Sequence, residues 1–274
     1  KMITPYSEAL QAVIWHCIVS DPRLMENKTK WWRQILKKMK NKFKIKIYAD
    51  GADMSSIIKL NKNKLINGFT TNPSLMRKSG VKNYKNFWKL LLKKVKKKPI
   101  SFEVFSDELS LMRSQALEIA SWGKNVFVKI PTINTKGVSN AKLIGKLNKE
   151  NIKLNVTAVY TANQTRKILK LVNKKTKVII SIFAGRAGDT GKDPVPEFKK
   201  SIALAKKYKN VEILWASVRE PYNFLQAKQI GCHIITVPPS IIEKIEKFGK
   251  TFTTLTLETV KAFLLDSKKS KFKI

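Results

Sequence analysis

Short apolar runs recur along this chain from Phe43 onward, and a stretch with helical periodicity follows each of them. Short runs rich in Val, Ile and Phe are typical of buried strands, whereas longer amphipathic stretches are typical of helices. Strict alternation of the two predicts a parallel sheet whose crossovers are helices. The predicted strands are Lys46–Ala49, Gly68–Thr70, Ile100–Val104, Val126–Ile130, Leu154–Val159, Val178–Phe183, Glu212–Ala216 and His233–Val237.

The segments between these strands, and the tail after them, show the helical pattern. The predicted helices are Ser55–Leu60, Asn83–Val95, Glu108–Trp122, Thr135–Lys149, Thr161–Val172, Glu197–Tyr208, Pro221–Gln229, Ser240–Phe248 and Thr256–Leu265. Strand–helix units of this number and size predict an α/β protein with a single (β/α)8 TIM barrel over residues 45–274. A doubly wound open sheet is the alternative, but no glycine-rich dinucleotide-binding fingerprint follows the first strand. Residues 1–44, with helical patterns at Glu8–Val19 and Lys30–Lys40, are predicted to be an N-terminal helical extension.

The chain is strongly basic, with 55 Lys and Arg residues against 19 Asp and Glu residues and a net charge of +36. Such a field attracts nucleic acids, anionic membranes or phosphorylated metabolites. Most of the excess is lysine spread along the whole chain, whereas a specific nucleic-acid reader more often shows arginines in clustered patches. We therefore favour a generally lysine-rich surface, and expect no specific nucleic-acid partner.

No apolar run approaches the roughly 18 residues needed to span a bilayer, and no clear signal-peptide pattern opens the sequence. The two cysteines, Cys17 and Cys232, make no disulfide framework, and the two histidines show no metal-ligand spacing. From these observations we expect a cytoplasmic protein with no membrane partner, no metal and no cofactor.

Lys129 lies in the run Val126–Pro131, which otherwise has the composition of a buried strand. A buried ammonium group is costly, so a lysine in this position is usually paired or loses its proton. A neutral lysine amine is a nucleophile toward carbonyl groups and can form a Schiff base. The alternative is a lysine that points outward from a half-buried strand.

The barrel prediction places chemistry at the carboxyl ends of the strands. Polar residues stand in or just after most of the predicted strands: Asp50, the run Thr70–Pro73, Glu103, Lys129, Asn155, Thr157, Ser181, Arg186, Ser217 and Arg219. A lysine, two carboxylates and two arginines are therefore expected to face one rim of the barrel.

These segments, in this order, resemble the transaldolase family of class I Schiff-base aldolases. The matching segments are Ala49–Asp53, Gly68–Leu75, Ile100–Val104, Val128–Pro131, Asn155–Tyr160, Ser181–Arg186 and Ala216–Arg219. The run TTNPS at Thr70–Ser74 and the run KIP at Lys129–Pro131 are specific together, whereas either run alone is a weak match.

The resemblance implies a role for each matching residue. Lys129 is implied to be the Schiff-base nucleophile, Asp50 the acid/base for the sugar hydroxyl, and Glu103 with Thr157 the holders of a proton-relaying water. Thr70, Asn72, Asn155 and Ser181 are implied to hold the dihydroxyacetone part of the sugar. Arg186, Ser217 and Arg219 are implied to bind its terminal phosphate, which suits the bidentate forks of arginine.

The implied function is transfer of a dihydroxyacetone unit from a ketose phosphate, of the sedoheptulose 7-phosphate or fructose 6-phosphate type, to an aldose phosphate, as in the pentose phosphate pathway. The small aldolases of the family cleave fructose 6-phosphate without transfer, and tend to have glutamine in place of Glu103 and tyrosine in place of Phe183. Both residues here resemble the transferases, and Phe183 is included in the predicted substrate site. A fructose-6-phosphate aldolase-like lyase is the alternative within the family.

The segment Gly185–Pro194 departs from the family pattern, and its glycines either expose backbone N–H groups to an anion or make turns. We favour turns. The departure leaves open a transaldolase that acts on a modified or non-phosphorylated sugar. A hypothesis of another class is a lysine-rich anion- or nucleic-acid-binding barrel without catalysis. Whether the protein is a homo-oligomer is also open, because the helix predicted at Thr256–Leu265 can dock on a neighbouring subunit or on its own barrel.

Overall fold

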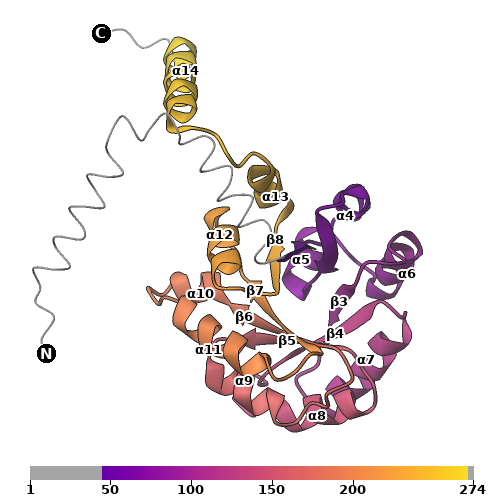
Figure 1. The fold of residues 1–274 in the computed structure, drawn as a ribbon. Coiled ribbons are helices and arrows are strands. Elements are labelled where there is room, and N and C mark those ends of the chain that lie inside the picture. The colour runs from indigo at the N-terminus through magenta and orange to yellow at the C-terminus, as the bar shows by residue number, and fades with distance from the viewer. Residues whose placement is uncertain (1–44, 271–274) are drawn as a thin grey trace, which may run out of the picture. The chain divides into compact units, whose positions relative to one another are not determined.

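A computed structural model of the chain describes residues 45–270, so the helices predicted within residues 1–44 lie outside the described residues. The described part contains a closed barrel of parallel strands, each paired with its neighbours in sequence and the last paired with the first (Figure 1). The strands are β1 Lys46–Asp50, β2 Ile66–Thr70, β3 Ile100–Glu103, β4 Val126–Pro131, β5 Leu154–Val159, β6 Val178–Phe183, β7 Val211–Ala216 and β8 Ile234–Val237. The predicted (β/α)8 TIM barrel is confirmed.

Helices follow the strands, and those that lie between two strands cover the outside of the barrel (Figure 1). They are α4 Met54–Lys62, α5 Pro73–Lys78, α6 Tyr84–Lys94, α7 Leu109–Ser121, α8 Ala141–Lys149, α9 Ala162–Leu169, α10 Ala184–Gly188, α11 Val195–Ala205, α12 Tyr222–Gln229, α13 Pro239–Glu246 and α14 Phe252–Ser270. Several begin at a side-chain cap: the Asp53 carboxylate accepts a hydrogen bond from the Ser56 N–H at the start of α4, and Thr161 caps α9 in the same way.

The two faces of the barrel strands belong to two separate cores. Outward-facing strand residues pack with the helices in one large buried cluster that includes Phe69, Phe102, Val128 and Ile180. Inward-facing residues form a second cluster, made of Tyr48, Phe127, Ile179, Leu214, Ala216 and Ile234. Because side chains alternate along a strand, the positions two residues further along each strand also point into the barrel.

On β1, β4, β6 and β8 those next inward positions are polar, and they form the layer above the inner apolar cluster. Asp50 follows Tyr48, and Lys129 follows Phe127. On β6, Ser181 comes two positions after Ile179, and on β8, the neighbour of β1, Thr236 comes two positions after Ile234. The barrel interior is therefore apolar in its lower layer and polar at the carboxyl ends of its strands, where catalytic groups of this architecture lie.

Gly68 makes room for the largest residue of the inner cluster. A Cβ atom at Gly68 would lie 2.6 Å from the ring of Tyr48, far inside normal contact distance. The absence of a side chain at Gly68 thus lets the Tyr48 ring lie against the neighbouring strand β2.

Two loops differ from the sequence prediction. The helix predicted at Thr135–Lys149 begins only at Ala141, because the Asn134 side chain accepts hydrogen bonds from the N–H groups of Lys136 and Val138 and closes a turn through Gly137, whose φ is +77°. The segment Gly185–Pro194, predicted as turns, starts with the short helix α10 and turns only afterwards. The prediction was wrong for its first residues.

The last described helix is longer than predicted: α14 covers Phe252–Ser270 rather than Thr256–Leu265. All its residues are exposed, including Phe252, Phe263 and Leu264. Within residues 45–270, no helix combines the length and the apolar character needed to cross a membrane.

Candidate active site

A cavity of about 520 Å³ opens at the carboxyl ends of the strands. Predicted site residues from seven of the strands or the loops that follow them line it: Asp50, Thr70, Asn72, Glu103, Lys129, Thr157, Ser181, Phe183, Arg186, Ser217 and Arg219. Of the residues predicted for the site, only Asn155 is missing from this lining. The structure thus brings together groups that lie up to 169 positions apart in the sequence, from Asp50 to Arg219.

Lys129 points into the barrel from β4 and is 6% exposed, so the outward-pointing alternative is wrong. Its Nζ atom lies 3.0 Å from Oε2 of Glu103 and donates a hydrogen bond to the Thr71 carbonyl oxygen at 3.1 Å. The pairing follows from sheet register, because Glu103 and Lys129 are direct partners on β3 and β4. The buried amine is thereby held at a fixed point, with a carboxylate as its nearest charged neighbour.

Asp50 ends β1 beside Thr70, its register partner on β2. The Thr70 hydroxyl donates to Asp50 Oδ1 at 2.7 Å and also lies 2.5 Å from the Thr236 hydroxyl. Burial raises the pKa of the Asp50 carboxyl above its ordinary value, while the Lys129 charge and the Thr70 hydrogen bond oppose that rise. The pKa of Asp50 is therefore set by opposing effects of burial and of its neighbours. Such tuning is typical of a general acid/base.

Thr157 carries a buried hydroxyl oxygen that has no hydrogen-bond partner among the described residues. It lines the cavity together with Lys129 and Glu103. The next residue, Ala158, has a φ of +57°, and the pairing of β5 with β6 is irregular between Val156 and Val159. A buried polar atom usually has a partner, so this hydroxyl is placed to receive one from the cavity.

Asn155 is 0% exposed and both ends of its amide are occupied. Its Nδ2 donates to Ser101 Oγ at 2.9 Å, and its Oδ1 accepts from Ser181 Oγ at 2.6 Å. Asn155 therefore links β3 to β6 and fixes the Ser181 hydroxyl, which does line the cavity. Asn155 itself does not line the cavity, and its predicted contact with the sugar stays a prediction.

Two arginines and a serine line the cavity after strands β6 and β7: Arg186, Ser217 and Arg219. The Arg186 guanidinium lies over the Phe183 ring at 5.5 Å, and its backbone N–H donates to Ser217 Oγ at 3.2 Å. Ser217 has a φ of +62°, a conformation that costs free energy in a residue other than glycine and is often kept at functional sites.

Arg219 already holds a carboxylate. Its Nε donates to Asp189 at 3.0 Å to Oδ1 and 3.2 Å to Oδ2, in a pair that is about half exposed. The hydrogen bonds from Arg219 lower the pKa of Asp189.

Gly185 lies against the backbone of Ser217, because a Cβ at this position would lie 1.8 Å from the Ser217 carbonyl oxygen. Only glycine lets α10 approach the end of β7 this closely.

Sequence reasoning missed several residues at the site. Ser74 and Lys78 of α5 line the cavity, and Asn72, whose Oδ1 caps that helix, lines it as well. Thr236 lines it from β8. A single polar residue at an inward position of the otherwise apolar run Ile234–Val237 was the signal for Thr236.

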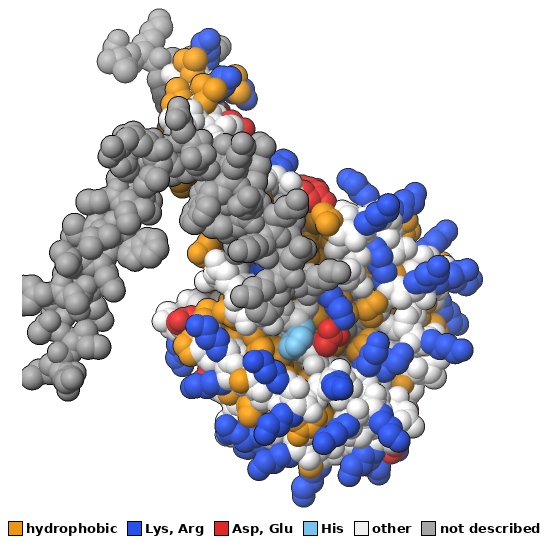
Figure 2. Space-filling view, in the orientation of Figure 1, with side chains coloured by type: hydrophobic (Ala, Val, Ile, Leu, Met, Phe, Trp, Pro, Cys, Tyr) orange, Lys and Arg blue, Asp and Glu red, His pale blue; other side chains and the backbone are white. Residues whose placement is uncertain are grey.

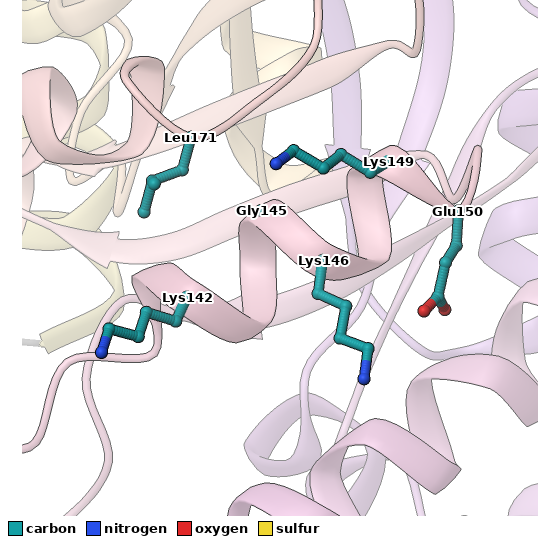
Figure 3. Close-up of a pocket in the computed structure, with 6 residues that line it drawn as sticks. All are labelled: Lys142, Gly145, Lys146, Lys149, Glu150 and Leu171. Carbon is teal, nitrogen blue, oxygen red and sulfur yellow. The ribbon is translucent and has the colours of Figure 1, made fainter.

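The described surface also has hollows outside the barrel mouth. One of about 370 Å³ lies along α8, where Lys142, Lys146 and Lys149 project in different directions beside Leu171 (Figure 3). Its one acid, Glu150, is engaged by Arg113 at 2.9 Å. Figure 2 shows Lys and Arg side chains scattered over the visible face of the barrel, rather than gathered in one stripe. The described part of the chain also lacks any group of three or more His, Cys, Asp or Glu side chains arranged to hold a metal ion.

Comparisons with known proteins show the family of the chain. The family model described as Transaldolase/Fructose-6-phosphate aldolase matches residues 47–274. A protein of Thermoanaerobacter sp. (strain X514) named "Probable transaldolase" is 34% identical over 233 residues, which are 84% of this chain and 100% of the relative. A protein of Nitrosopumilus maritimus (strain SCM1) with the same name is 34% identical over 229 residues, which are 83% of this chain and 96% of the relative.

A solved structure of a protein from Coccidioides immitis, described as belonging to the dihydrodipicolinate synthase family, shares the barrel fold with a TM-score of 0.53. The identity is 9%, over 69% of this chain and 65% of that one, so this likeness concerns the fold alone. The family match spans residues 47–274, which include every residue that lines the cavity. The chain therefore belongs to the transaldolase/fructose-6-phosphate aldolase family.

Proposed function

We propose that this protein transfers a dihydroxyacetone unit from a ketose phosphate to an aldose phosphate through a Schiff base on Lys129. The observation that carries the proposal is the buried Lys129 amine, 3.0 Å from the Glu103 carboxylate, in a cavity that also contains Asp50. Membership of the family and the names of the relatives support a transaldolase-type reaction.

Imine formation requires the neutral amine of Lys129, and Glu103 is the nearest acceptor for the ammonium proton. The amine attacks the C2 carbonyl carbon of the ketose, and the resulting carbinolamine loses its oxygen as water once a proton reaches it. Glu103 and the Thr157 hydroxyl both face this position and can hold the water molecule that carries the proton. The product of this step is a protonated imine on Lys129.

Cleavage then breaks the C3–C4 bond of the sugar. The Asp50 carboxylate takes the proton of the C4 hydroxyl as that oxygen becomes the carbonyl of the departing aldehyde. The bonding electron pair moves into the imine and leaves an enamine on Lys129. Transfer reverses these steps: the enamine carbon attacks a second aldehyde, Asp50 returns its proton to the new hydroxyl, and water releases the new ketose.

The remaining residues of the cavity position the substrate. The hydroxyls of Thr70 and Ser181 and the amide of Asn72 are proposed to hold the dihydroxyacetone part, with Asn155 acting through Ser181. Arg186, Ser217 and Arg219 are proposed to bind the terminal phosphate, because guanidinium forks match phosphate oxygens. The scattered lysines in Figure 2 support small phosphorylated substrates, rather than a nucleic acid, as the protein's partners.

The test is product analysis with fructose 6-phosphate, alone and with erythrose 4-phosphate. A transferase forms sedoheptulose 7-phosphate and glyceraldehyde 3-phosphate only when the acceptor is present. A lyase, the alternative within the family, releases dihydroxyacetone from fructose 6-phosphate alone. A folded protein that gives neither result with these sugars would contradict the proposed substrates. The same assay with fructose that carries no phosphate then tests whether the protein acts on a non-phosphorylated sugar, as the unusual segment Gly185–Pro194 left open.

A further inference from the structure

Thr236 is buried at the catalytic layer of the barrel without a role in the reaction described above. It is 5% exposed, and it lies on β8, the strand that closes the barrel against β1. Its Oγ1 atom lies 2.5 Å from Oγ1 of Thr70, and the Thr70 hydroxyl donates to Asp50 Oδ1 at 2.7 Å. Strand β1 stands between β2 and β8, so the two threonines meet from both sides of the strand that carries Asp50.

The number of protons fixes the direction of this chain of hydrogen bonds. Each hydroxyl has one proton to donate, and an ionised carboxylate can only accept. When Asp50 is ionised, the Thr70 proton points to Asp50, and the Thr70 oxygen must then accept from Thr236. When Asp50 holds a proton, the chain can run in the opposite direction. Hydrogen bonds in such a chain polarise one another, and those that end on a charge are the stronger ones.

We propose that Thr236 is a positioning residue for the Asp50 carboxylate, acting through the Thr70 hydroxyl, which it holds in the orientation of a donor. Thr236 thereby favours the form of Asp50 that can accept the sugar hydroxyl proton. The meaning of this effect for catalysis rests on the proposed function of Asp50, whereas the effect on the carboxylate itself does not.

Charged groups around Asp50 also affect the pKa of its carboxyl group. Lys129 on β4 favours the ionised form of Asp50, and Glu103 on β3 disfavours it. On β2 and β8, the groups joined to the carboxylate by this chain are the uncharged hydroxyls of Thr70 and Thr236. Because burial already raises the pKa of Asp50, weakening the donor chain raises it further.

The experiment compares Thr236→Val, which removes the hydroxyl at nearly constant shape, with Thr236→Ser, which keeps it. The pKa of Asp50 is measured in the ligand-free full chain by 13C NMR of labelled Asp carboxyl groups, with Asp50→Asn to assign the resonance. We expect Thr236→Val to raise the pKa by about half to one unit, and Thr236→Ser to leave it unchanged. Thr165→Val is the matched control. It removes a buried hydroxyl on α9, which is paired with Ser201 of α11 at 3.0 Å and does not line the cavity.

An unchanged pKa in Thr236→Val, or an equal shift in Thr236→Ser or Thr165→Val, would overturn the proposal. Should Thr236→Val fail to fold, Thr236→Ala takes its place in the same comparison. Kinetics then separate this proposal from the proposed function. If Lys129 is the nucleophile, the acid limb of the cleavage rate moves up in Thr236→Val by the same amount as the pKa, while imine formation is unaffected. If no imine forms in any variant, the function fails and the NMR result still decides the role of Thr236.

Discussion

Lys129 Nζ lies 3.0 Å from Glu103 Oε2, and the two residues are direct partners on neighbouring strands β4 and β3. The ion pair is mostly shielded from solvent, with 8% of the lysine side chain and 18% of the glutamate side chain exposed. An amine that stays protonated is no nucleophile, so in the proposed mechanism the Glu103 carboxylate accepts the proton that Lys129 must lose. The pair therefore predicts how the site responds when the charge of Glu103 is removed.

Replacing Glu103 by glutamine keeps the shape of the side chain and removes its ability to take a proton. We expect the rate of imine formation at Lys129 to fall by about 10²- to 10⁴-fold, the usual contribution of a positioned acid/base. Rapid-mixing kinetics of imine formation measure this directly. Glu212→Gln is the control, since it removes the carboxylate that pairs with Lys46 at 2.7 Å, at the other end of the barrel. An equal loss in both variants would contradict a specific role for Glu103.

Replacing Arg219 by lysine keeps the charge and removes the planar fork. We expect kcat/KM for a phosphorylated ketose to fall by about 10- to 100-fold, because one charge-assisted bidentate contact is lost. The value for non-phosphorylated fructose should change little. Arg113→Lys is the matched control, because Arg113 makes a similar two-point contact with Glu150 on the outside of the barrel. Equal losses with both sugars would argue against phosphate binding by Arg219.

Asp50→Asn should raise the stability of the protein at neutral pH while it abolishes cleavage. Burial raises the pKa of Asp50 above 3.8 in the folded state, so its contribution to stability is complete at low pH and is lost as the pH rises through the folded pKa. The neutral amide avoids that loss. Thermal unfolding at pH 7 should show a higher Tm, by about 2–4 °C for each kcal/mol relieved, and the difference from the unchanged protein should shrink toward pH 3. A lower Tm at pH 7 would show that Asp50 stabilises the fold.

Gly185→Ala should lower the stability of the protein and disturb the arrangement of Ser217 and Arg219, which are proposed to bind phosphate. Its Cβ would meet the Ser217 carbonyl oxygen at 1.8 Å, so the end of β7 or helix α10 must move, at a cost of about 1–3 kcal/mol or more. Gly188→Ala in the same helix is the control, because a Cβ there meets nothing within 4 Å and alanine favours a helix. Denaturant unfolding of both variants checks the prediction. Similar free energies of unfolding for the two would contradict the close approach.

The sequence predicted the barrel because alternation of strand and helix is a local pattern that repeats. The site could be predicted in large part as well, since inward polar positions at strand ends, such as Lys129 and Glu103, are read from the same alternation. Thr236 could not be placed beside Thr70 in this way. Their contact depends on closure of the barrel between β8 and β1, which brings together residues 166 positions apart.

The errors have local physical causes. Residues Thr135–Asn140 continue the helical pattern of α8, but the Asn134 side chain binds the backbone and holds a turn instead. The start of α10 was missed because Gly185 and Gly188 weaken a helical prediction, whereas packing against Ser217 requires Gly185 there. The pair of Asp189 with Arg219 spans 30 positions, and no local pattern indicates it.

The most direct test of the account is borohydride trapping in the presence of fructose 6-phosphate, with Lys129→Ala beside the unchanged protein. Intact mass and peptide mapping locate any adduct. We predict a reduced three-carbon adduct on the peptide that contains Lys129, and no adduct in the folded variant, because the enamine and imine form on that amine alone. An adduct on another lysine, or an equal adduct in Lys129→Ala, would contradict the assignment of Lys129 as the Schiff-base nucleophile.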